Sequence, residues 1–109
     1  MVKITIKYER KDFFNTYVYS EDTTEPRDAE TAVKMATKAF KLVLTADAGL
    51  EINRPDGEGL TAYQDYSDRE KDVVTVKCYH AINVCDALKV STSQARKLIK
   101  AICTGGYIA

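Results

Sequence analysis

The sequence has no tryptophan, one histidine, two prolines and three cysteines among its 109 residues. An odd number of cysteines suits reduced thiols better than the disulfide framework of a small secreted domain. No apolar run is long enough to cross a bilayer, and the N-terminal residues alternate charged and apolar side chains instead of forming a signal peptide. We therefore expect a cytoplasmic protein that does not associate with membranes.

The chain also lacks an excess of either charge, because its 16 basic and 16 acidic residues cancel at pH 7. No overall field therefore draws it toward nucleic acid or an anionic membrane. The charges are unevenly spread, since the segment from Asp72 onward has five basic and two acidic residues. Repeats, linkers and low-complexity tracts are absent as well, so residues 1–109 are predicted to form a single domain.

The most regular pattern is that of one long amphipathic helix over residues 28–49. Asp28 can cap the first turn, and Gly49 is predicted to end the helix in a left-handed conformation. Such a helix is marginal alone in water, so its apolar side must pack against the rest of the chain. The apolar residues that repeat at intervals of four and three are Ala29, Val33, Ala36, Phe40 and Val43.

Alternating apolar and polar residues, or runs of β-branched and aromatic residues, predict the strands. Strands at residues 2–8 and 13–20 would form a hairpin before the helix. Three further strands, at residues 50–53, 60–66 and 73–80, would follow the helix as a meander. The turn at Arg54, Pro55, Asp56 and Gly57 and the charged turn at residues 67–72 separate these three strands.

The C-terminal part is predicted to contain two helices. A short one covers residues 81–88, and a second begins at Ser91, because Ser91 and Gln94 have the spacing of a capping box. The complete order is ββαβββαα. This order indicates an α+β fold in which one long amphipathic helix and a C-terminal helical pair pack on a mostly antiparallel sheet of about five strands.

Residues 84–102, VCDALKVSTSQARKLIKAI, resemble the helix-turn-helix of bacterial and phage DNA-binding proteins. Small Cys85 stands at the close contact of the first helix, Leu88 and Val90 bracket the turn, and Ser91 starts the second helix. The resemblance implies a duplex DNA partner, with the second helix facing the groove. The alternative is a plain helical hairpin that covers the sheet and has a solvated basic side. The DNA-facing residues that the resemblance implies are Thr92, Ser93, Gln94, Arg96 and Lys97, with Lys100 near phosphate.

A competing pattern mixes acidic residues with tyrosines in the predicted turns and on the second strand. Carboxylates beside tyrosines are typical of surfaces that dock onto basic protein surfaces, because tyrosine buries a large area at low entropic cost. The alternative is that the turns are charged only for solubility. The candidate protein-binding residues are Tyr17, Tyr19, Tyr63, Asp65, Tyr66, Asp68 and Glu70.

Patterns that indicate catalysis or metal binding are few. Cys78 and His80 would share one side of a strand, which is compatible with a nucleophile and its base. Cys85 and Cys103 would add two zinc ligands, but the paired C-x-x-C spacing of structural zinc sites is absent. No glycine-rich loop precedes a helix to bind phosphate. We therefore predict no catalytic residue, no metal and no cofactor.

The leading hypothesis is a non-enzymatic binding protein that docks onto a host protein or a protein–nucleic acid complex, as an inhibitor or adaptor. The size and style of the chain suggest a setting among the small accessory proteins of phages and mobile elements, including inhibitors of host defence nucleases, although no family motif in the sequence indicates it. The second hypothesis is a DNA-binding regulator that uses residues 84–102. The third is a small enzyme that uses Cys78 and His80. A homodimer through the tyrosine-bearing side of the second strand is left open.

Overall fold

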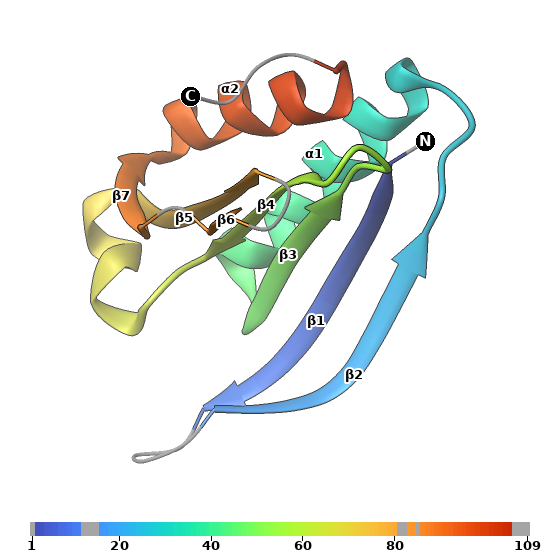
Figure 1. Ribbon diagram of the computed structural model, residues 1–109. Coiled ribbons are helices and arrows are strands. Elements are labelled where there is room, and N and C mark those ends of the chain that lie inside the picture. The colour runs from blue at the N-terminus through green and yellow to red at the C-terminus, as the bar shows by residue number, and fades with distance from the viewer. Residues whose placement is uncertain (1, 12–15, 81–82, 85, 106–109) are drawn as a thin grey trace.

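The computed structural model describes residues 2–11, 16–80, 83–84 and 86–105. Within these ranges the chain forms seven strands, two α-helices and one 3₁₀ helix. The strands make one sheet in the order β2-β1-β3-β4-β5-β6, with β7 also paired to β5, and every pairing is antiparallel. Both α-helices lie on one side of this sheet (Figure 1). The predicted α+β class with an antiparallel sheet is confirmed, although the sheet has more strands than predicted.

The chain begins with a hairpin of β1 (Lys3–Lys11) and β2 (Thr16–Thr24). β2 continues past the predicted end at residue 20, because the length of β1 offers it further backbone partners. Lys7 lies opposite Glu21, and the hydroxyls of Thr5 and Thr23 are 2.9 Å apart. The predicted start of this strand, at residues 13–15, lies outside the described residues.

Helix α1 (Ala29–Thr45) follows, and its predicted N-cap is confirmed. Asp28 Oδ1 accepts a hydrogen bond from the backbone amide of Thr31 at 2.7 Å. The prediction that Gly49 ends the helix is wrong. The helix ends at Thr45, its C-cap Ala46 has extended backbone, and Gly49 lies within β3 (Ala48–Asn53), opposite Lys7 of β1. The early exit places the next strand so that Ala48 and Leu50 join the core.

The predicted meander is confirmed as β3, β4 (Glu58–Tyr63) and β5 (Val73–His80). The turn between β3 and β4 uses Gly57, whose φ of 91° lies in the left-handed region that glycine tolerates. β4 stops at Tyr63 and not at residue 66, because residues Tyr66–Lys71 form the 3₁₀ helix. Asp72, with φ 55°, then turns the chain into β5.

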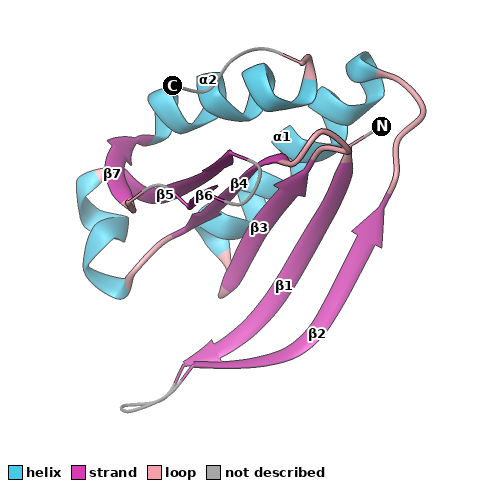
Figure 2. Cartoon of the chain, viewed as in Figure 1, coloured by secondary structure: helices cyan, strands magenta, loops and turns pink. Residues whose placement is uncertain are grey.

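The prediction of a helix over residues 81–88 is wrong. The chain returns instead along the free edge of β5, as β6 (Asn83–Val84) and then β7 (Leu88–Ser91) (Figure 2). Pairing satisfies backbone groups of β5 that a helix at this place would leave exposed. Residues 81, 82 and 85 of the predicted helix lie outside the described residues.

Helix α2 (Thr92–Cys103) begins where it was predicted to begin. Ser91 Oγ accepts a hydrogen bond from the amide of Gln94 at 3.1 Å, which is the first half of the predicted capping box. The predicted C-terminal helical pair is therefore replaced by strand pairing and one helix. α2 packs beside α1 and against β4, β5 and β7.

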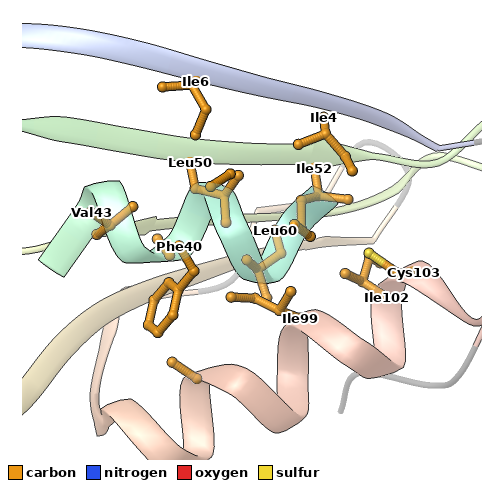
Figure 3. Packing of buried hydrophobic residues seen from close by; sticks show 14 of the residues in the cluster. Ile4, Ile6, Phe40, Val43, Leu50, Ile52, Leu60, Ile99, Ile102 and Cys103 are labelled. Atoms are coloured by element: carbon orange, nitrogen blue, oxygen red, sulfur yellow. The ribbon is translucent and has the colours of Figure 1, made fainter. Parts of the chain in front are cut away.

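The core lies between the helices and the sheet (Figure 3). Successive side chains of a strand point alternately to this layer and to the opposite face, so the buried apolar residues of β1, β3, β4 and β5 are spaced two apart, as Val74 and Val76 are in β5. Phe40 of α1 is fully buried and Ile99 of α2 is 2% exposed. The largest fully buried side chains are Phe40, Leu50, Ile52, Leu60, Ile99, Ile102, Val43, Val74 and Asp68.

Candidate functional site

The face of the sheet opposite α1 and α2 is built from the residues that alternate with the core. Thr5 and Lys7 come from β1, Glu51 from β3, and Tyr63 from β4, and each is partly exposed. The two helices pack on the other side, so this face presents side chains from strands far apart in sequence. The pairing register aligns Thr23, Thr5, Glu51, Thr61 and Lys77 in one row across five strands.

This face is hollowed over its central strands by a depression of about 260 Å³. Gly49 leaves room on its floor, because no side chain stands there opposite Lys7. Tyr79 packs over Gly59, where an added Cβ would lie 3.2 Å from the tyrosine ring and 2.9 Å from Asn53 Oδ1. The residues that give this hollow its chemistry are Lys7, Glu51, Thr61, Tyr63, Lys77 and Tyr79.

An ion pair fixes one wall of the hollow. Lys7 Nζ lies 2.7 Å from Glu51 Oε2, and Asn53 Nδ2 donates to Glu51 Oε1 at 2.9 Å. Burial acts to raise the pKa of Glu51, but the hydrogen bonds from Lys7 and Asn53 outweigh it and the pKa is lowered. The hydrogen bond to Glu51 likewise raises the pKa of Lys7. Both groups are therefore charged and paired at neutral pH, which suits binding better than proton transfer.

Asp68, which was predicted to bind a protein partner, instead forms hydrogen bonds within the fold. Asp68 is only 2% exposed, accepts a hydrogen bond from Lys89 Nζ at 3.0 Å, and accepts another from the amide of Asp65 at 3.2 Å. The hydrogen bond from Lys89 lowers the pKa of Asp68. This carboxylate holds the 3₁₀ helix against β7, so it is not presented to a partner.

The other predicted docking residues are dispersed. Asp65 and Glu70 are exposed, and Tyr63 lines the hollow. The side chains of Tyr17, Tyr19 and Tyr66 lie outside what the structure describes. Tyr79, which sequence analysis missed as a site residue, lies in the same hollow as Tyr63. Its alternation with Cys78 could have indicated the uncovered face.

Of the predicted DNA-facing residues, one is buried in the fold and the other five are exposed on α2. Thr92 is buried and donates its hydroxyl to Asp72 Oδ1 at 2.7 Å. The first helix that the resemblance to a helix-turn-helix requires is not found, because β6 and β7 occupy residues 83–84 and 88–91. The residues left exposed on α2 are Ser93, Gln94, Arg96, Lys97 and Lys100.

Cys78 and His80 share one side of β5, as their spacing predicts. Cys78 packs partly buried against the core, and His80 Nδ1 lies 2.7 Å from Glu58 Oε2. Burial raises the pKa of the Cys103 thiol to about 11, so it stays protonated at neutral pH. Cys85 lies outside the described residues. In the described part of the chain, no three side chains of histidine, cysteine, aspartate or glutamate are grouped as a metal site.

No protein-family model, no curated protein and no solved structure matches this chain. In the described ranges, neither α-helix has the length and apolar character needed to span a membrane. The evidence for a function therefore comes from the surfaces of the molecule itself. Two surfaces differ in kind: the hollowed face of the sheet, and the outer side of the two helices.

Proposed function

We propose that this is a non-enzymatic binding protein that docks onto a protein partner through the hollowed face of its sheet. The observation that carries the proposal is the placement of Tyr63 and Tyr79 around one hollow, on a face that α1 and α2 do not cover. Tyrosines at the centre of a surface supply much of the binding energy in protein interfaces. A cytoplasmic role as an inhibitor or adaptor is part of the same proposal.

The charges of this face favour a protein partner over a nucleic acid. Lys7 and Lys77 are balanced there by Glu9 and Glu51, so the hollow does not attract a polyanion. The Lys7–Glu51 pair also holds its wall in one conformation, which reduces the entropy lost on binding. A preformed hollow with both signs of charge fits a polar protein surface that inserts one side chain between the tyrosines.

Site-specific photocrosslinking tests this proposal in cells. Tyr79 is replaced by p-benzoylphenylalanine, an aromatic residue that keeps a ring over Gly59, and the matched control has the same crosslinker at Lys34 on α1. We expect one dominant protein adduct from residue 79 and none of that mass from residue 34. Equal adducts from both positions, or none from residue 79, would contradict the proposal.

The identified partner then allows a quantitative test. Tyr79→Ala should weaken its binding by at least about tenfold, as expected when a central tyrosine is removed from an interface. Tyr79→Phe, which retains the ring, should lose much less affinity. Both variants are measured by titration calorimetry, with thermal melts to show that each is folded.

A further inference from the structure

The outer side of the two helices has a basic surface that the docking proposal does not use. It consists of six residues, here called the helix-layer cations, and all six are exposed. Glu30 is the acidic residue within α1, and α2 contains none. The helix-layer cations are Lys34, Lys38, Lys41, Arg96, Lys97 and Lys100.

Most of these cations have no ion pair within the described residues, whereas several cations of the sheet and loops have one. Among the described residues, Lys34 is the one helix-layer cation with an ion pair, to Glu30 at 3.5 Å, and both side chains are more than three-quarters exposed. An exposed pair of this kind within one helix is weak. Outside the two helices, ion pairs involve Lys3, Lys7, Arg54, Arg69 and Lys89, and none involves the described residues Arg27, Lys71 and Lys77.

The fold places the helix-layer cations on neighbouring elements. Lys34, Lys38 and Lys41 follow the four-and-three spacing of one stripe along α1. α2 packs beside α1, and the guanidinium carbon of Arg96 lies 5.5 Å from the centroid of the Phe40 ring. Arg96 therefore lies at the junction of the two helices, which run beside one another (Figure 1).

We infer that this basic surface binds the phosphate backbone of duplex nucleic acid, independently of base sequence. Charge complementarity carries the inference, because unpaired lysine and arginine side chains bind nucleic acid by releasing counterions from its phosphates. Single strands are disfavoured, since binding them usually relies on aromatic stacking. Phe40 is the aromatic residue of the two helices, and it is fully buried.

The absence of base reading follows from how α2 is held. A recognition helix must project into the major groove. α2 lies flat against the sheet and beside α1, and the hydroxyl of Thr92 at its start is occupied by Asp72. Because this surface and the hollowed face lie on opposite sides of the sheet, the proposal is independent of protein docking. One molecule could bridge a duplex and a protein.

Fluorescence anisotropy with two 20-base-pair duplexes of unrelated sequence tests the inference between 50 and 200 mM NaCl. We expect equal affinity for both duplexes and a slope of log K against log salt of about −0.9 per phosphate neutralised. Six cations would thus lower the affinity by about 10³-fold over this range. The variant Lys38→Ala/Lys97→Ala should reduce the slope by about two and weaken binding to both duplexes equally.

The matched control is Lys3→Ala/Lys71→Ala, which removes the same charge from β1 and from the 3₁₀ helix, outside both the hollow and the two α-helices. It should leave the slope unchanged, and thermal melts establish that both double variants are folded. The inference would be overturned by no binding at 50 mM NaCl, by a control that weakens binding as much, or by a strong preference for one duplex. Tighter binding of a single strand of equal length would also overturn it.

Discussion

The hollowed face of the sheet and the outer side of the helices hold their charges differently. On the hollowed face, Lys7 is tied to Glu51, which is itself hydrogen-bonded to Asn53. On the helices, Lys38 and Lys97 have no ion-pair partner within the described residues. The difference indicates that charges of the first kind help to fix the sheet, whereas those of the second kind are available to a partner.

The same difference separates the acidic residues. Asp68 and Asp72 connect the 3₁₀ helix to the segment that follows β5, through Lys89 and Thr92 respectively. They therefore act in folding, although their sequence pattern is that of a solvated turn. An acidic residue is a docking candidate only if its carboxylate has no such internal partner, and Glu70 meets that condition better than Asp68.

Phe40→Ala should have the largest effect on stability, and it should disturb the layer of helices on one side of the sheet. The ring is fully buried between α1, α2 and the sheet and supports Arg96, so its loss affects the core and the basic surface together. We expect the free energy of unfolding to fall by about 3–5 kcal/mol, as for other buried aromatic side chains. Urea denaturation measures the loss.

Met35→Ala serves as the control for Phe40→Ala, because Met35 is 40% exposed on the same helix. Met35→Ala should lower the free energy of unfolding much less than Phe40→Ala does. Similar losses for the two variants would mean that the helix does not pack as described.

Sequence patterns predicted those parts of the fold that local rules decide. Asp28 caps α1 and Ser91 caps α2 because each side chain satisfies an amide only three residues away. Gly57 likewise serves a turn of a few residues. Such contacts can be recognised without knowledge of the rest of the chain.

Sequence patterns failed where a distant partner decides the structure. Residues 88–91 alternate over only four positions, and they become a strand because the edge of β5 is free to pair with them. Asp68 is buried because Lys89, 21 residues later, returns to it. The hollow could be anticipated only in part, because the register of β4 and β5 decides that Tyr63, opposite Thr75, and Tyr79, opposite Gly59, lie on the same face of the sheet.

Asp68→Asn tests the claim that this carboxylate belongs to the fold. The hydrogen bond from Lys89 lowers its pKa in the folded state, so the charged form stabilises the protein above the ordinary value of 3.8. This contribution is lost as the pH falls through the lowered pKa. The variant should therefore have a lower urea midpoint than the wild type at pH 7, and the two should converge toward pH 2.

Glu70→Gln is the control for this pH dependence, because Glu70 is exposed in the same 3₁₀ helix. Its curve should run parallel to that of the wild type. A constant gap between Asp68→Asn and the wild type from pH 7 to pH 2 would show that the Asp68 charge does not contribute to stability.

The smallest expected effects on stability come from removing one lysine on each face of the molecule, and they compare the two faces directly. Lys7→Ala and Lys97→Ala each remove one positive charge, but only Lys7 has an ion pair, with its side chain 35% and that of Glu51 27% exposed. Because water still screens such a pair, Lys7→Ala should cost at most about 1 kcal/mol of unfolding free energy. Lys97→Ala should change it by no more than about 0.5 kcal/mol, since alanine is the better helix former and no partner is lost.

Urea denaturation at low salt and at 0.5 M salt distinguishes the two variants, because salt should diminish only the loss of unfolding free energy caused by Lys7→Ala. Equal costs would mean that the helix-layer cations also stabilise the fold, and the reason to regard them as available for a partner would be lost.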